Sequence, residues 1–354
     1  MKQATFFGNA RIEIQEVAEP VPGPGEVKIA VAYCCICGSD SHMFFGPLVV
    51  NGPHPLSGKA PPFPLGHEVS GVVTEVGVEV TRFKPGDRVA VQPVVSCGHC
   101  YACQKGWYNL CQTRGMIGGT QPGGMAEYLC VSEHQVFPIA SEMPLLDAAL
   151  VQCGAFPFGG VMQSGMTLGD SCAIIGAGTC GLMAVQAAKA AGASEIIVTD
   201  RSDAKLHLAK QMGATQTLNV TQEDVRTEVL EYTGGIGVDY AFDTVGMDNT
   251  LDEALACIRP NGTVMVMVND YDYTERYSFA CHDFWNKQAV IKCAFSPYVG
   301  QYAKMVELAR TRVMDARSLV TRIIALEDVE RDGFLALEQE QDQIKIVIKI
   351  HDFE

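Results

Sequence analysis

The sequence of 354 residues is poor in basic side chains and has no apolar run of membrane length. Lys and Arg number 26 against 41 Asp and Glu, which gives a formal net charge of −15. Nothing resembles a basic patch, which argues against nucleic-acid and anionic-membrane partners. The longest apolar stretch, 172–185, is too short for a bilayer and predicts a buried strand and helix. Residues 1–17 alternate like strands and lack the apolar core of a signal peptide.

Cysteine, in contrast, is plentiful, with 14 residues in the chain. Six of them are assigned to metal sites below, which leaves eight scattered thiols. Free cysteine is a common small core residue, and disulfides are rare in reducing compartments. We therefore expect a cytoplasmic protein.

Four of the cysteines stand close together, in the order C-x2-C-x2-C-x7-C: Cys97, Cys100, Cys103 and Cys111. Four thiolates satisfy a tetrahedral zinc ion completely, so such a site is closed and structural. Two disulfides, or a chance cluster of buried thiols, are the alternatives. Cysteines spaced C-x2-C bridge each other poorly, which favours zinc.

The two halves of the chain differ in their patterns. Up to about residue 155, short β segments alternate with turn residues, for example 26–33, 71–78, 88–91 and 127–131, which predicts a barrel-like β domain. From Asp170, strands alternate with helical patterns, including a helix capped by Ser202 and stopped by Gly213. This second pattern is typical of a doubly wound parallel sheet in an α/β domain. Further strands are expected at 238–242 and 263–268, a helix at 302–310 and a last strand at 344–350.

A glycine-rich loop, Gly176-Ala177-Gly178-Thr179-Cys180-Gly181, directly follows the apolar strand 172–175. Its glycines permit a tight turn, close approach of a pyrophosphate and close packing of strand and helix. Asp200 follows Gly181 by 19 residues and can accept hydrogen bonds from ribose hydroxyls, unless it merely initiates a helix. Asp200 would repel the 2′-phosphate of NADP and so favour NAD, whereas the adjacent Arg201 reduces this preference. The loop therefore predicts NAD as the cofactor.

Two further segments suggest an open metal site. Cys37 follows the first long strand, and His67 precedes the next one. A catalytic zinc needs about three protein ligands and one open position. Either residue alone is more often structural, so the inference depends on their occurrence beside the four-cysteine run and the glycine loop.

Together these motifs resemble the zinc-dependent medium-chain dehydrogenases, which include alcohol, polyol, threonine and butanediol dehydrogenases. The resemblance covers essentially the whole chain. It implies a GroES-like β-barrel catalytic domain at 1–155, with a four-cysteine lobe at about 93–112. It further implies a Rossmann NAD-binding domain at 156–292 and a return to the catalytic domain at 293–354. Within that family the resemblance is to butanediol- and sorbitol-type enzymes, and the segment Pro53–Lys59 is similar to a segment of butanediol dehydrogenases.

The resemblance also implies roles for single residues. Cys37 and His67 become zinc ligands, and Glu68 becomes either a neighbour of the metal or an exchanging ligand. Ser39 becomes the hydroxyl that takes the substrate proton, and His42 passes that proton outward.

One departure concerns the third ligand of this zinc. Butanediol and sorbitol enzymes usually carry Glu-Pro where this chain has Gln152-Cys153, a sequence more similar to classical alcohol dehydrogenases. A thiolate binds zinc well and a carboxamide binds it poorly, so we expect Cys153 to be the third ligand. The alternative is that Glu68 closes the site.

The function implied is reversible oxidation of a secondary alcohol or vicinal diol by NAD, with one catalytic and one structural zinc per chain. An amino-alcohol or simple secondary-alcohol dehydrogenase is the nearest alternative. An NAD- and zinc-dependent dismutase or lyase and a non-catalytic NAD-binding protein are the others. The apolar segment 289–295 would lie at a sheet edge, so we expect a homodimer or homotetramer.

Overall fold

The computed structural model describes residues 1–46, 52–268, 278–279, 281–295, 299–340 and 342–353. The chain divides into two compact units. The first comprises residues 1–155, 296–312 and 316–354, and the second comprises 156–295 and 313–315. Within the described part of the chain, no helix is long and apolar enough to cross a membrane.

The main sheet of the first unit runs in the order β10-β6-β5-β3-β18-β17, and β9 pairs with the first half of β3. The sheet packs on a core of aliphatic and aromatic side chains. The strand bounds are β3 (Glu26–Cys35), β5 (Glu68–Val76), β6 (Arg88–Val91), β9 (Tyr128–Ser132), β10 (Val136–Pro138), β17 (Val320–Ala325) and β18 (Lys345–Lys349).

These strands confirm the β segments expected from the sequence, with one shift that matters for function. β5 begins at Glu68, three residues before the expected start, because Cys35 of β3 pairs with Glu68. The pairing therefore places Glu68 inside the sheet.

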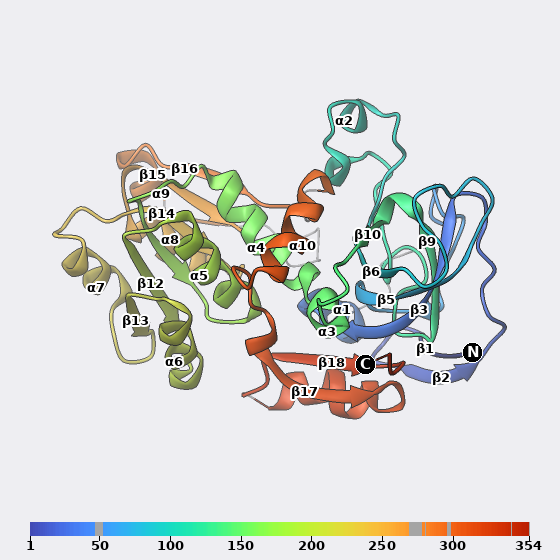
Figure 1. Cartoon of the computed structure of the whole chain (residues 1–354). Helices are drawn as coiled ribbons and strands as arrows, with labels where there is room; N and C mark the ends of the chain where they lie inside the picture. The colour runs from blue at the N-terminus through green and yellow to red at the C-terminus, as the bar shows by residue number, and fades with distance from the viewer. Residues whose placement is uncertain (47–51, 269–277, 280, 296–298, 341, 354) are drawn as a thin grey trace. The chain divides into compact units, whose positions relative to one another are not determined.

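Smaller elements complete the first unit. A three-stranded sheet has the order β2-β1-β4, and β7 pairs with β8. Their bounds, with those of the helices, are β1 (Lys2–Phe6), β2 (Ile12–Glu16), β4 (Phe63–Pro64), β7 (Val94–Val95), β8 (Gly115–Met116), α1 (Gly38–Phe45), α2 (Tyr101–Gln104), α3 (Leu145–Ala149), α10 (Tyr302–Arg310) and α11 (Ala336–Gln339). α2 lies in a lobe that projects from the rest of this unit (Figure 1). A π-helix (Val329–Leu335) precedes α11.

The second unit contains a parallel sheet in the order β13-β12-β11-β14-β15-β16. This is the order of a doubly wound dinucleotide-binding sheet, and it confirms the predicted fold class. The strands are β11 (Ser171–Ile175), β12 (Glu195–Asp200), β13 (Gln216–Asn219), β14 (Val238–Asp243), β15 (Ile258–Val266) and β16 (Val290–Cys293). Helices flank the sheet (Figure 1): α4 (Val151–Ser164), which begins in the first unit, α5 (Thr179–Ala191), α6 (Asp203–Met212), α7 (Val225–Tyr232), α8 (Asp248–Cys257) and α9 (Cys281–Asn286).

Local sequence signals explain several of these elements. The Ser202 hydroxyl accepts a hydrogen bond from the Lys205 backbone N–H, and Gly213 ends α6 with φ of +125°, so both predicted limits of this helix are confirmed. The strand expected at 263–268 corresponds to β15, which begins earlier, at Ile258, and so includes Asn261. Asn261 has φ of +58°, and the pairing of β14 with β15 shifts register nearby.

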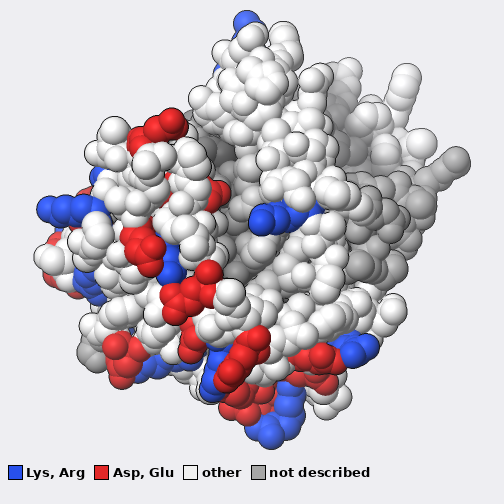
Figure 2. All heavy atoms as spheres, turned by 90° about the vertical axis from the view of Figure 1, so that its right-hand side faces the viewer, with Lys and Arg blue, Asp and Glu red and all other residues white. Residues whose placement is uncertain are grey.

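Charged side chains of both signs cover the surface. On the face that Figure 2 shows, acidic and basic side chains intermingle, and no continuous basic area is visible. Exposed ion pairs such as Lys2–Glu327 and Arg331–Asp332 contribute to this mixed surface.

Candidate metal centres and dinucleotide site

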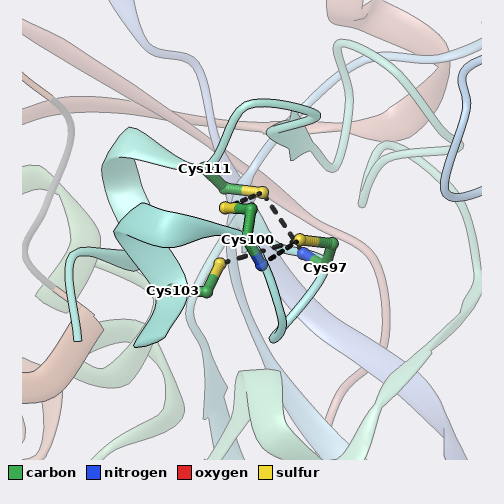
Figure 3. A group of neighbouring side chains, drawn as sticks. All are labelled: Cys97, Cys100, Cys103 and Cys111. Carbon is green, nitrogen blue, oxygen red and sulfur yellow. Dashed lines mark hydrogen bonds between the residues drawn. The ribbon is translucent and has the colours of Figure 1, made fainter. Parts of the chain in front are cut away.

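The four cysteines of the lobe converge on one point. Their sulfur atoms all lie within 4.8 Å of one another and point toward a common centre (Figure 3). The sulfurs of Cys97 and Cys103, and those of Cys100 and Cys111, are each 3.9 Å apart. Ligands at about 2.3 Å from a tetrahedral zinc lie about 3.8 Å from each other, so the spacing fits zinc. It is far too long for disulfides, and every cysteine of the chain is a free thiol.

The charges of the four thiolates in the lobe also favour binding of a cation. Backbone N–H groups of Cys103 and Gln112 lower the pKa of Cys100 to about 6, whereas burial raises the pKa of Cys103 to about 12. Four thiolates at this spacing repel one another unless a metal ion holds them. The cluster is therefore suited to a structural metal.

A second cluster begins where β3 ends. Cys37 is the N-cap of α1, and its backbone N–H donates to a carboxylate oxygen of Asp40 at 2.9 Å. Asp40 is fully buried and also accepts from the Gly66 N–H at 3.3 Å. A single carboxylate thus ties the Cys37 loop to the segment that carries His67.

His67 is buried and held in one orientation. Its Nδ1 lies 3.3 Å from Asp40 Oδ1, which leaves Nε2 for a metal. Burial by itself lowers the pKa of His67, but Asp40 and the contact with Cys37 raise it well above its ordinary value. Gly66 makes this approach possible, because it has φ of +90° and a Cβ there would lie 2.5 Å from the sulfur of Cys34.

Glu68 completes this cluster. One ligand atom each from Cys37, His67 and Glu68 lies within 4.8 Å of the other two. The Glu68 carboxylate forms a buried ion pair with Lys345 at 2.6 Å, and Lys345 Nζ also donates to the Ile36 carbonyl at 3.0 Å. A thiol, an imidazole and a carboxylate are a donor set that zinc accepts, so these residues fit a zinc site.

The structure does not bring Cys153 into that group. Its sulfur lies outside the set of mutually close ligand atoms, although the charges of Lys345, Glu68 and Cys37 act on it. Burial raises the pKa of Cys153 to about 12, so without a metal the thiol stays protonated. The preceding Gln152 is buried, and its Oε1 has no hydrogen-bond partner among the described residues. The role predicted for Cys153 stays a prediction.

Ser39 and His42 lie on α1, directly after Cys37. They stand three positions apart on the helix, so they share one face of it. Ser39 is half-buried and His42 is exposed, so together they lead from the Cys37 end of α1 toward solvent.

The glycine loop of the second unit has the geometry that phosphate binding requires. Gly176 has φ of +93°, and a Cβ at Gly181 would lie 1.9 Å from the Gly176 carbonyl oxygen. Gly178 is the N-cap of α5 and would have open space around a Cβ, so the helix N-terminus is accessible to an anion. Thr179 and Cys180 form the first turn of α5.

Asp200 lies at the end of β12, beside this loop. Its carboxylate accepts hydrogen bonds from the backbone N–H groups of Ala177 and Ser202, each at 2.8 Å. These bonds fix the carboxylate in the position where a ribose would meet it. Arg201 is exposed next to it.

Two residues of the open cluster were missed from the sequence. Asp40 carries a recognisable signal, because it stands three residues after an N-cap position and such a residue reaches back to the cap. Lys345 carries none, because a lysine in an alternating strand ordinarily faces water. Only the pairing of β18 with β3 shows that Lys345 lies next to Glu68.

The family follows from comparison with known proteins. Residues 23–141 match the alcohol dehydrogenase GroES-like domain, and residues 179–311 match the zinc-binding dehydrogenase family. The chain is 35% identical to (R,R)-butanediol dehydrogenase of Bacillus subtilis over 355 residues, which covers 99% of each chain. The chain belongs to the zinc-dependent medium-chain alcohol dehydrogenase family. The predicted family, its two-domain architecture and its oxidoreductase activity are thereby confirmed.

Other members of this alcohol dehydrogenase family are similar over the same length. Sorbitol dehydrogenase of Bacillus subtilis is 33% identical, over 98% of this chain and 97% of its own. The crystal structure of 2R,3R-butanediol dehydrogenase from Bacillus subtilis superposes with a TM-score of 0.90 at 34% identity, over 98% of this chain and 99% of the other.

The family binds zinc and nicotinamide cofactors. A zinc-binding dehydrogenase of Sinorhizobium meliloti was solved with NADP, at 29% identity and a TM-score of 0.88, over 98% of each chain. A dehydrogenase of Escherichia coli was solved with NADH, at 27% identity and a TM-score of 0.88, over 99% of each chain. This chain is accordingly a zinc-binding dehydrogenase that uses a nicotinamide cofactor.

Proposed function

We propose that this dehydrogenase reversibly oxidises secondary alcohols, vicinal diols first among them, with NAD as hydride acceptor. The observation that carries the proposal is the cluster of half-buried Cys37 with buried His67 and Glu68. Asp40 contacts Cys37 and His67, and Ser39 follows Cys37 on α1. The relatives named for butanediol and sorbitol support a diol or polyol as the substrate.

Each chain would hold two zinc ions. The structural one would be held by Cys97, Cys100, Cys103 and Cys111. For the catalytic one we propose Cys37, His67 and Glu68, because these three already lie together. Bound there, zinc would lower the pKa of a substrate hydroxyl, and NAD would accept the hydride.

The residues of the chain supply orientation and proton transfer. Asp40 holds His67 so that Nε2 faces the metal. Ser39 accepts the proton of the substrate hydroxyl and passes it toward His42, whose exposure lets the proton reach solvent. Exclusion of water by the buried cluster strengthens every charge interaction within it.

NAD selectivity would depend on Asp200. The carboxylate is oriented by the Ala177 and Ser202 N–H groups, so it can accept from ribose hydroxyls and repel a 2′-phosphate. Arg201, being exposed beside it, reduces this preference without reversing it.

The proposal is tested by following NADH absorbance with a panel of butanediol isomers, sorbitol, threonine and simple secondary alcohols. We expect the highest kcat/KM with a vicinal diol. The highest rate with threonine would assign the chain to the amino-alcohol enzymes. Turnover without net NADH would indicate a dismutase or lyase, and no turnover with any compound would indicate a non-catalytic NAD-binding protein.

The third zinc ligand is decided by metal analysis of three variants. If Glu68 closes the site, Glu68→Gln loses the catalytic zinc whereas Cys153→Ala retains it. The reverse result would establish Cys153, the ligand that the sequence favours. Gln152→Ala serves as control and should keep both metals, because a carboxamide contributes little to zinc affinity.

We further propose a homodimer or homotetramer in a reducing compartment such as the cytoplasm. β16 lies at the edge of the parallel sheet, with Val290 and Cys293 exposed, and can pair with its copy. The 14 free thiols, five of them assigned to metal here, suit reducing conditions. A monomeric mass in light scattering would contradict the first proposal.

A further inference from the structure

A buried carboxamide directly after β6 lacks a hydrogen-bond partner in the described part of the chain. Gln92 has no exposed surface, and neither its Oε1 nor its Nε2 has a hydrogen-bond partner among the described residues. Buried side-chain amides are almost always hydrogen-bonded, because a desolvated and unpaired polar group is costly. The unpaired amide of Gln92 at a buried position therefore suggests a functional role.

The strand register places Gln92 opposite Glu68. β5 and β6 are antiparallel, with Ser70 paired to Ala90 and Val69 to Val91. Continued by one residue, which on the second strand lies just past the end of β6 at Val91, this register brings Gln92 opposite Glu68. Side chains at directly opposed positions have Cβ atoms about 4.5–5.5 Å apart, which is within reach of both side chains.

Both residues are on the same face of the sheet. Val69 and Val91 belong to the core of the first unit, so their neighbours Glu68 and Gln92 project from the opposite face. Tyr302 independently indicates that the end of β6, next to Gln92, lies near Glu68. Its hydroxyl donates to the Val91 carbonyl at 2.9 Å, and burial, followed by the charge of Glu68, raises its pKa.

Glu68 is itself only partly satisfied. Its Oε2 forms the ion pair with Lys345 but no hydrogen bond to the described residues. A carboxylate that binds a metal through one oxygen normally receives a hydrogen bond on the other. The Gln92 side chain can donate two such bonds from Nε2.

We propose that Gln92 is a positioning residue of the metal site. Its amide N–H becomes the hydrogen-bond donor to Glu68 when that carboxylate turns from Lys345 to the metal. Gln92 touches neither substrate nor cofactor and acts through Glu68 alone. The inference depends on the proposed function, since it assigns Glu68 to the catalytic metal.

The test is Gln92→Met, which removes both polar atoms and keeps the length of the side chain. Zinc affinity is measured in the full-length protein by competition with a chromophoric chelator, and thermal unfolding is measured on the metal-free protein. We expect affinity at the Cys37–His67 site to fall ~10- to 100-fold, while the four-cysteine metal is retained. We expect the unfolding temperature not to fall, because the lost groups had no partners.

A double-mutant cycle with Glu68→Gln shows whether Gln92 acts through Glu68. Glu68→Gln loses this zinc on purification but keeps Cys37 and His67 as weaker ligands, and at saturating zinc Gln92→Met should not change the residual affinity at that pair. Gln135→Met is the matched control, because the Gln135 amide already donates toward the carbonyls of Gln92 and Pro93. It should lower the unfolding temperature and leave zinc affinity unchanged.

Three results would overturn the inference: unchanged zinc affinity in Gln92→Met, an equal loss in the Glu68→Gln background, or an equal loss in Gln135→Met. A failure of the proposed function looks different. In that case the wild-type protein would bind no metal at Cys37 and His67, and no variant could be compared with it.

Discussion

The buried ion pair between Lys345 and Glu68 gives the sharpest test of how this molecule is held together. Both side chains are 2% exposed, and the Lys345 ammonium also donates to the Ile36 carbonyl. Burial by itself lowers the pKa of Lys345, but Glu68 and the neighbouring thiols raise it well above its ordinary value, so the lysine is charged. Lys345→Met removes that charge and keeps most of the side-chain volume.

The expected cost is large because Glu68 is left as an uncompensated buried charge. Breaking one partner of a buried pair costs about 3–5 kcal/mol, whereas replacing both partners with neutral groups is far less damaging. Lys345→Met should therefore lower the free energy of unfolding of the first unit by about 3–5 kcal/mol. Adding Glu68→Gln should restore most of that loss.

The assay is urea unfolding followed by hydrogen exchange of peptides from β3 and β18, which report on the first unit alone. A chelator is included so that Glu68 has no metal to bind. Lys2→Met is the control, because the Lys2–Glu327 pair has a similar distance, 2.7 Å, but side chains 46% and 49% exposed. It should have little measurable effect. Equal effects of Lys345→Met and Lys2→Met would refute the reasoning.

Three further predictions concern other parts of the molecule. Cys100→Ser should reduce the metal content from two ions per chain to one and lower thermal stability, because a closed site acts through folding free energy; two ions in this variant would contradict it. Asp200→Ser should shift the kcat/KM ratio from NAD toward NADP, and an unchanged ratio would show that Asp200 does not contact the ribose. Asp243 is fully buried, and burial raises its pKa, so its stabilising contribution is present at low pH and is lost as pH rises through the folded pKa. Asp243→Asn should therefore gain stability relative to wild type as the pH rises above about 4, the ordinary pKa of an aspartate, as measured by urea unfolding, and a pH-independent difference would disprove this.

Much of the fold could be predicted because it depends on neighbours in sequence. The helix 302–310 has the expected bounds, and Ser202 and Gly213 limit α6 as anticipated. The strand, glycine loop and helix around Gly176 form one local unit. The four-cysteine cluster could likewise be predicted from local sequence, because a run of 15 residues can surround a metal with few contacts from the rest of the chain.

The open metal cluster could be predicted only in part. Cys37 and His67 stood out through their motifs, but the choice between Glu68 and Cys153 as the third ligand stays a prediction. Ligand chemistry favoured the thiolate, whereas the structure places the carboxylate with Cys37 and His67. The metal-binding variants described above decide between them.

The sequence by itself determined the family motifs, the caps and the periodicity, because these are set within one or two turns or one strand. The tertiary structure decided which distant side chains meet at the cluster. The register of β3, β5 and β6 sets the place of Glu68 and, continued one residue past β6, brings Gln92 opposite it. Lys345 comes from β18, near the other end of the chain. Strand pairing moves every side chain to the other face when it slips by one residue, so no local pattern could have specified these contacts.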